Sequence, residues 1–215
     1  MNKDYYSLRS DPFANRADPD ALVMTRPARR ALATLLDAVA ARRPVSALLG
    51  DPGMGKTTLL WALADALAER GHPVAMAGAP ADFAELVEAL SLAGGDEGQF
   101  PAMLIAPRAP VLLIDDADLL DEATREALRE RLDGPWRGLV VVVAGNAARL
   151  KPELVERLTP LGHAEAVAYL RHRLEAAMLD DVAPLDDEAL SLIADAAGGA
   201  PRDLNQLAAH LLDAG

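Results

Sequence analysis

Short apolar runs alternate with stretches of helical periodicity along most of the chain. Four apolar runs predict buried strands, at residues 45–49, 73–77, 111–114 and 139–144. Apolar side chains at helical spacing predict helices at residues 27–42, 58–70, 82–92 and 122–132. Strands that alternate with helices form parallel sheets, and strands that are apolar throughout are buried on both faces. We therefore predict an α/β fold in which helices cover both faces of a parallel sheet.

The last quarter of the chain shows helical spacing and no strand pattern. The predicted helices there are residues 164–179, 186–197 and 201–213. An irregular, turn-rich segment precedes the first helix of the chain. The predicted parts are an N-terminal arm at 1–25, an α/β domain at 26–162 and an all-helical lid at 163–215.

Two segments carry weaker patterns. Residues 96–110 fit a loop that contains one short helix, and Gly94-Gly95 is expected to end the helix before it. Residues 152–158 are expected to form a short helix.

The composition is that of a globular protein with an acidic surface. The chain has 215 residues, a formal net charge of -12 and no cysteine. The lack of cysteine excludes a disulfide scaffold, a thiolate metal site and a cysteine nucleophile. No signal peptide is visible, and no apolar run approaches the ~18 residues needed to span a bilayer. We therefore expect a cytoplasmic protein without a direct membrane span.

The charge is unevenly distributed. Residues 1–50 contain eight Lys and Arg against five Asp and Glu, a net of +3, so the remainder carries -15. The acidic total disfavours nucleic-acid binding, because phosphates require Lys and Arg. The basic segment fits either a solvated helix face or a docking surface for an acidic neighbour, including another copy of the chain. Its basic residues include Arg26, Arg29, Arg30, Arg42 and Arg43.

A glycine-rich octapeptide joins the strand at 45–49 to the next helix. The pattern G-x-x-x-x-G-K-[ST] is met by Gly50-Asp51-Pro52-Gly53-Met54-Gly55-Lys56-Thr57, and Thr58 follows. Glycines let the backbone approach phosphate oxygens, and the N–H groups and helix dipole attract the anion. Lys56 is expected to reach the β- and γ-phosphates, and Thr57 to place its hydroxyl on magnesium. The sequence thus predicts a site for ATP and Mg²⁺ along these nine residues.

An acidic pair ends the apolar run at 111–114. An acidic residue at the end of a strand beside the loop strand can hold the magnesium shell, and we assign this role to Asp115. Asp116 would orient or deprotonate the attacking water, or would only cap the next turn. Because aspartate is shorter than the glutamate often found there, hydrolysis is expected to be slow or partner-dependent.

With these motifs and the helical tail, the chain resembles the AAA+ ATPases. Within them it looks most like the group around the general-secretion-pathway A protein (ExeA-like), with the TniB-like transposition ATPases nearby. The resemblance covers nearly the whole chain. It rests on Tyr5-Tyr6-Ser7-Leu8, Asp11-Pro12-Phe13 and Asp18-Pro19, on Gly50 to Thr57, on Leu113-Ile114-Asp115-Asp116-Ala117, and on Gly199-Ala200-Pro201-Arg202-Asp203-Leu204-Asn205.

The resemblance implies three further roles. Asn146 would be a first sensor near the γ-phosphate, or else an Asn that forms a turn. Arg202 would reach back to the phosphates from the lid, or else face solvent. Arg157 would be an arginine finger that projects into a neighbouring subunit, a role for which Arg149 competes.

The chain also departs from the family pattern. Thr159-Pro160-Leu161 follows Leu158 almost at once, so the fifth strand of the family is expected to be missing or tiny. Secretion-type relatives continue into a membrane span, whereas this sequence stops soon after the lid, so a membrane role would need a partner.

These features predict an AAA+-type ATPase that forms a homo-oligomer and remodels or positions a protein partner. One alternative is a nucleotide-gated binding module with little hydrolysis. Another is a transposition-type ATPase that assembles on DNA through its basic N-terminal surface. A small-molecule kinase shares the phosphate loop, but the motif at 199–205 argues against it.

Overall fold

The computed structural model describes residues 8, 10–14, 23–80, 82–93, 100–179 and 183–214. These residues fall into two compact units. The sheet unit comprises residues 28–51 and 56–158, and the helical unit comprises the described residues of 1–27, 52–55 and 159–215. Outside the described residues lie Tyr5-Tyr6-Ser7, Asp18-Pro19 and Gly94-Gly95.

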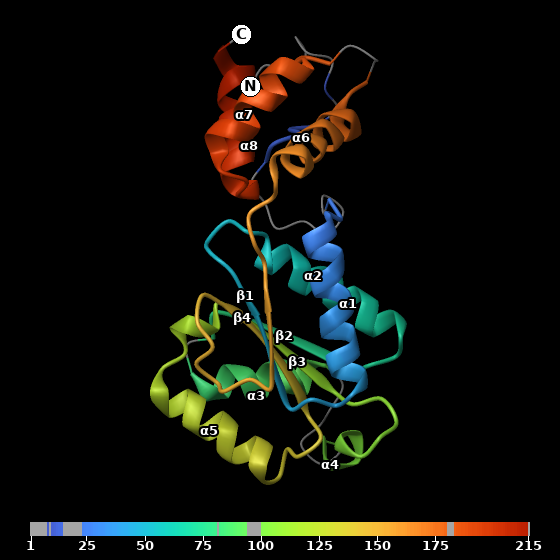
Figure 1. Ribbon diagram of the computed structural model, residues 1–215. Coiled ribbons are helices and arrows are strands. Elements are labelled where there is room, and N and C mark those ends of the chain that lie inside the picture. Colours follow the sequence, from blue (N-terminus) through green and yellow to red (C-terminus); the bar gives the residue numbers. More distant parts are fainter. Residues whose placement is uncertain are drawn as a thin grey trace. The chain divides into compact units, whose positions relative to one another are not determined.

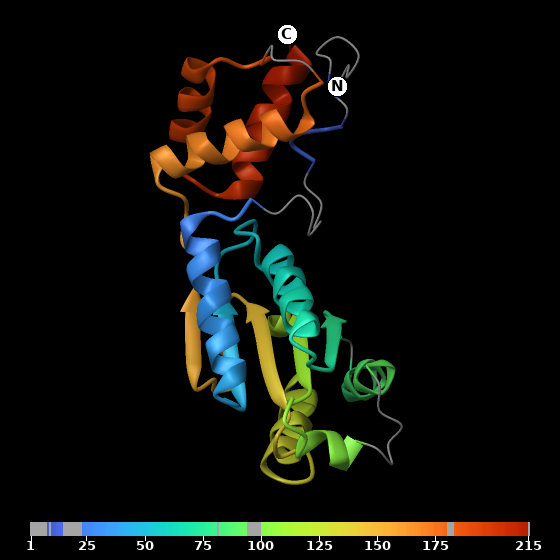
Figure 2. The same cartoon turned by 90° about the vertical axis from the view of Figure 1, so that its right-hand side faces the viewer.

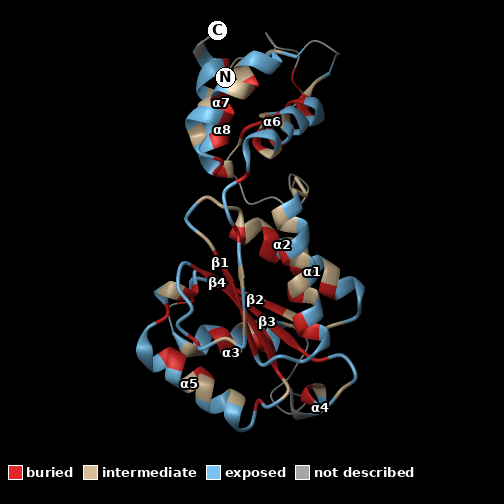
Figure 3. Cartoon of the chain, viewed as in Figure 1, coloured by how far each residue is buried: buried red, intermediate tan, exposed pale blue. Residues whose placement is uncertain are grey.

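The sheet unit is built on five parallel strands in the order β2-β3-β4-β1-β5 (Figure 1). The strands are β1 (Val45–Leu49), β2 (Val74–Gly78), β3 (Val111–Asp115), β4 (Val140–Gly145) and β5 (Leu154–Arg157). Every residue of the three central strands β1, β3 and β4 is buried (Figure 3). The continuous apolar runs in the sequence are explained by this burial on both faces.

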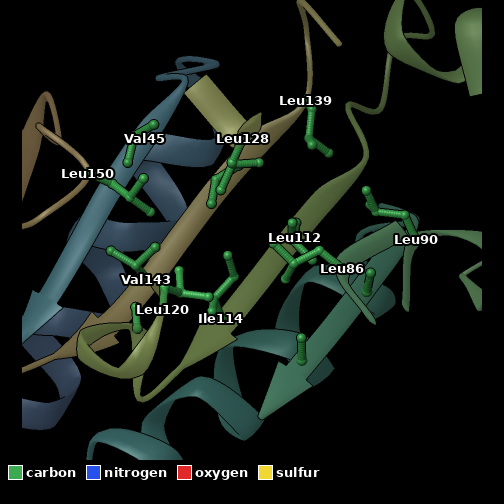
Figure 4. Packing of buried hydrophobic residues seen from close by; sticks show 14 of the residues in the cluster. Val45, Leu86, Leu90, Leu112, Ile114, Leu120, Leu128, Leu139, Val143 and Leu150 are labelled. Carbon is green, nitrogen blue, oxygen red and sulfur yellow. The ribbon is translucent and has the colours of Figure 1, made fainter. Parts of the chain in front are cut away.

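Helices cover both faces of the sheet, as predicted. On one face lie α1 (Arg26–Ala40) and α2 (Lys56–Glu69), and on the other α3 (Phe83–Leu92) and α5 (Glu122–Asp133) (Figures 1 and 2). Figure 4 shows the core beneath α3 and α5, where Leu86 and Leu128 pack with Ile114 and Val143 of the sheet. The short helix expected within 96–110 is α4 (Phe100–Leu104), and an unpredicted turn of 3-10 helix, η2 (Ala117–Leu119), follows β3.

The expectation of a helix at 152–158 is wrong, and the fifth strand, expected to be missing or tiny, is present with four residues. Residues Leu154–Arg157 form β5, which pairs with β1 in parallel. Its flanking residues also join the ladder, because Glu153 N–H donates to the Val45 carbonyl and Leu158 N–H to the Leu49 carbonyl. An edge strand of four residues is too short to display a reliable period of two.

The helical unit contains three helices, as the sequence pattern predicts. They are α6 (His163–Ala177), α7 (Asp187–Ala197) and α8 (Pro201–Ala214). The N-terminal segment contributes to their core, since Leu8 and Phe13 are buried among the apolar faces of these helices. Arg173 fastens that segment by donating from Nε to the Pro12 carbonyl over 2.6 Å. Among the described residues, no helix has the length and apolarity required to cross a membrane.

Candidate nucleotide-binding site

The glycine-rich loop runs from the end of β1 into the first turn of α2. Gly53 and Gly55 have φ angles of 88° and 85°, which glycine adopts without steric strain. Gly50 N–H donates to the Gly145 carbonyl over 3.2 Å, so the start of the loop is tied to the end of β4. The N-terminus of α2 leaves backbone N–H groups at the loop, where they favour an anion.

The ammonium group of Lys56 lies between the loop and the end of β4. Its Nζ donates to the Gly50 carbonyl at 2.7 Å, the Asp51 carbonyl at 3.2 Å and Asn146 Oδ1 at 3.2 Å. The residue is 8% exposed. Lys56 and Asn146 are 90 positions apart in the sequence, and the structure brings them together. The sequence had placed each of them near the γ-phosphate on separate grounds.

The hydroxyl of Thr57 donates to Asp115 Oδ2 over 2.6 Å. Asp115 is buried at the end of β3, and its second oxygen accepts the Asp116 N–H at 3.0 Å. The expectation that this strand lies beside the loop strand is wrong, because β4 lies between β3 and β1. Thr57 reaches Asp115 from α2, which packs across β2, β3 and β4.

The Thr57 and Asp115 oxygens suit a magnesium ion. Both are hard oxygen donors, and Mg²⁺ in nucleotide sites takes one or two protein ligands and completes its shell with water and phosphate oxygens. The described part of the chain contains no group of three or more His, Cys, Asp or Glu residues that could hold a metal.

Asp116 occupies a strained backbone position directly after Asp115. Its φ and ψ are 45° and 41°, a left-handed conformation that costs a residue with a side chain of order 1 kcal/mol or more. The residue is exposed. Its carboxylate is therefore open to solvent at the edge of the sheet where Asp115 is buried.

Asp118 is a part of this arrangement that the sequence analysis missed. Its carboxylate accepts the Asn146 N–H and, at 3.0 Å, the Ala147 N–H. A Cβ on Gly145 would lie 2.8 Å from Asp118 Oδ1, so a larger residue there would push the carboxylate away from these N–H groups. Asp118 thus orients the turn that presents Asn146 to Lys56. The only sequence signal was a third aspartate in Asp-Asp-Ala-Asp, which resembles an ordinary solvated turn.

Asp118→Ala is expected to loosen that turn. The substitution removes two charge-assisted acceptors, each worth about 1.5–3 kcal/mol, so amide hydrogen exchange at Asn146 and Ala147 should accelerate at least about tenfold. Asp82→Ala is a matched control, because Asp82 accepts the Glu85 N–H at the start of α3 over 3.1 Å. That variant should accelerate exchange at α3 alone. Unchanged exchange at Asn146 in Asp118→Ala would show that Asp118 does not hold the turn.

All three candidate arginines are exposed. Arg149 and Arg157 are exposed, and Arg157 is the last residue of β5, in register with Leu49. Within the described residues neither of them forms an ion pair. Arg202 is exposed in the first turn of α8, in the same unit as loop residue Gly53, whose carbonyl accepts the Arg202 backbone N–H over 3.2 Å.

Comparisons with known proteins agree with this fold. The chain is similar to domain III of the replication initiation protein DnaA from Thermotoga maritima, with 19% identity, a TM-score of 0.64, and coverage of 94% of this chain and 89% of that one. It is also similar to RuvB from Thermotoga maritima (20% identity, TM-score 0.61, covering 94% and 66%). A third neighbour is Drosophila ORC bound to DNA (20% identity, TM-score 0.62, covering 88% and 55%).

At these identities the likeness establishes the fold, and the chain spans less than two thirds of the RuvB and ORC chains. No curated protein matches the sequence. The family model described as "AAA domain" matches residues 30–210, which include the loop, Asp115 and the start of α8. The chain therefore belongs to the AAA domain family and has the AAA+ P-loop ATPase fold.

Proposed function

We propose that the protein is an AAA+-type ATPase that couples ATP binding and hydrolysis to remodelling or positioning a protein partner. The observation that carries the proposal is the 2.6 Å contact between Thr57 Oγ1 and Asp115 Oδ2. It joins the end of the phosphate loop to the acidic end of a strand that is distant in sequence. Such a pair serves a magnesium-bound phosphate, which α2 would attract at the same place.

In this proposal the ATP phosphates lie along residues 50–58. The loop N–H groups bind the phosphate oxygens, and Lys56 moves its ammonium group from the loop carbonyls to the β- and γ-phosphates. Thr57 and Asp115 would hold the magnesium ion, and a bound ion would neutralise charge that develops on the phosphates.

Hydrolysis needs a positioned water in line with the γ-phosphorus. Asp116 is the proposed base: the water oxygen bonds to phosphorus, the bond to the ADP oxygen breaks, and Asp116 accepts the water proton. Its exposed carboxylate is accessible to that water. Asn146 would orient the water or the γ-phosphate, which fits its contact with Lys56.

Two arginines would complete the transition-state charge balance. Arg202 would sense the nucleotide from the helical unit. Arg157 would act as a finger in the site of a neighbouring copy, in a homo-oligomer. The observation that β5 exists supports this role, because Arg157 ends that strand next to the carboxyl end of β1. Arg149 is the competing finger.

The sequence resemblance favours a place in the ExeA-like and TniB-like group, and hence a cytoplasmic role in a secretion-related or other macromolecular assembly. An ATPase that assembles on DNA is the second candidate. It is favoured by the neighbours, which include ORC bound to DNA and DnaA bound to AMPPCP and single-stranded DNA. The net charge of -12 disfavours it.

A concentration series tests the assembly part of the proposal. ATP turnover per chain should rise with protein concentration, because a finger from a neighbouring copy can accelerate hydrolysis by about 10³-fold or more. Arg157→Ala should remove that rise, whereas Arg137→Ala, which removes an exposed arginine elsewhere, should keep it.

Mixing two inactive variants sharpens this test. Arg157→Ala keeps the phosphate loop, and Lys56→Ala keeps the finger, so their mixture should recover turnover that neither variant has alone. Turnover that stays flat with concentration, with no recovery on mixing, would contradict a finger supplied by a neighbour. If nucleotide still bound, the nucleotide-gated module would be the better description.

A further inference from the structure

A basic cavity lies at the opposite edge of the sheet from the phosphate loop. It has a volume of about 260 Å³ and is lined at the ends of α1 and α2 and by the segment before β3. These positions precede β1, β2 and β3, whereas the phosphate loop follows β1. Strands of five residues separate the two edges by about 16 Å at 3.3 Å per residue. The cavity is therefore distinct from the nucleotide site.

The charged lining of this cavity is predominantly cationic. It contains Arg42, Arg70 and Arg108, together with His72 and one carboxylate, Asp37. With a neutral imidazole the formal charge is +2, in a chain whose total is -12. Three guanidinium groups around one cavity repel each other unless an anion or helix carbonyls offset them. The lining thus favours an anionic ligand.

One of these arginines builds the cavity. Arg42 has a φ of 52°, a left-handed conformation that a side chain disfavours. From this position its guanidinium donates to the carbonyls of Leu104, Ala106 and Pro107. These contacts hold the segment that carries Arg108 against the end of α1.

The other two arginines keep donors available. Arg70 uses Nη1 to bond the Ala66 carbonyl at 2.6 Å, which leaves its other N–H groups to the cavity. Arg108 is exposed, and within the described residues neither Arg70 nor Arg108 forms an ion pair. His72 Nδ1 lies 2.9 Å from the Ala109 carbonyl, which can only accept, so Nδ1 carries a proton and Nε2 is left to the cavity. The bond to the Ala66 carbonyl at the end of α2 gives Arg70 a structural role, whereas no hydrogen bond or ion pair among the described residues gives one to Arg108.

We propose that this cavity is a binding site for a phosphate group, separate from the ATP site. Guanidinium forks match phosphate oxygens in pairs, which an ammonium group cannot do. At about 30 Å³ per water, a volume of 260 Å³ has room for roughly eight water-sized groups, enough for pyrophosphate or for one nucleotide phosphate with its sugar. The same chemistry is offered by a free phosphorylated small molecule and by the backbone of a nucleic-acid strand.

The test uses two probes while Mg-ADP saturates the phosphate loop. Pyrophosphate binding is measured by calorimetry, and binding of a labelled 20-nucleotide single strand by fluorescence anisotropy over a salt series. Arg108→Ala and Arg70→Ala/Arg108→Ala remove cavity charges, and Arg137→Ala removes one exposed charge outside the cavity. The full chain is used throughout, and Lys56→Ala reports any residual binding at the loop.

Either of two results supports the proposal. A small-molecule site predicts pyrophosphate binding that the double variant weakens at least tenfold and Arg137→Ala leaves unchanged. A nucleic-acid site predicts oligonucleotide binding that weakens as salt rises. In the double variant the slope of log affinity against log salt concentration should become shallower by about 1.4, because each of the two removed arginines would neutralise one phosphate at about 0.7 per phosphate. The proposal is overturned if neither probe binds at low salt, if Arg137→Ala weakens binding equally, or if Lys56→Ala alone abolishes it.

Discussion

Lys56→Ala is expected to weaken ATP binding about a hundredfold while the chain stays folded. The substitution removes an ammonium group that would make one or two charge-assisted bonds to phosphates, about 3 kcal/mol in total. In the free protein the same group bonds three oxygens, two of which are loop carbonyls that water can satisfy afterwards. Anisotropy of a fluorescent ATP analogue measures the affinity directly.

Lys151→Ala is the matched control, because Lys151 is an exposed lysine away from the loop. It should bind the analogue like the wild type. The melting temperature gives a second readout: saturating ATP should raise it in the wild type and in Lys151→Ala, and much less in Lys56→Ala. Equal affinity in Lys56→Ala and the wild type would place the nucleotide elsewhere.

Asp115→Asn is expected to reduce magnesium-dependent ATP hydrolysis by about 10³-fold with a smaller loss of ATP affinity. The amide keeps the size of the buried side chain but loses the charge that would hold the cation near Thr57. A bound metal ion stabilises the charge of the transition state by several kcal/mol, so its loss accounts for a factor of this size. Steady-state phosphate release at several magnesium concentrations measures the effect.

Asp116→Asn separates the metal role from the role in preparing water. Both variants should hydrolyse ATP slowly, but only Asp115→Asn should require more magnesium for half-maximal activity. Asp116 is exposed, and only its backbone N–H contacts the Asp115 carboxylate. Asp116→Asn keeps that N–H, so the Asp115 carboxylate stays in place to hold the magnesium ion. An unchanged magnesium requirement in Asp115→Asn would contradict the assignment of Asp115.

Much of the fold could be predicted from local patterns. The strands β1, β3 and β4 are continuous apolar runs because they are buried on both faces, and such runs are visible in a sequence. The phosphate loop could be predicted from the sequence for a similar reason. Its glycines meet a local requirement, since Gly53 and Gly55 need positive φ angles within a few residues of Lys56.

Features that depend on distant contacts could not be predicted in this way. The strand β5 exists because β1 offers it an open edge, and four residues carry too little periodicity to show it. The sheet order places β4 between β1 and β3, which no local pattern records. Asp118 became a positioning residue only when the fold brought it to the turn at Asn146.

Phosphate release from ATP by the wild-type chain and by Lys56→Ala, with magnesium and with excess EDTA, is the most direct test of the central claim. If the chain is a magnesium-dependent ATPase, the wild type should release phosphate with magnesium and should stop doing so with EDTA. Lys56→Ala should release none under either condition. Equal phosphate release by the two proteins would contradict ATP hydrolysis at this loop. So would a wild-type chain that binds ATP but releases no phosphate at any protein concentration.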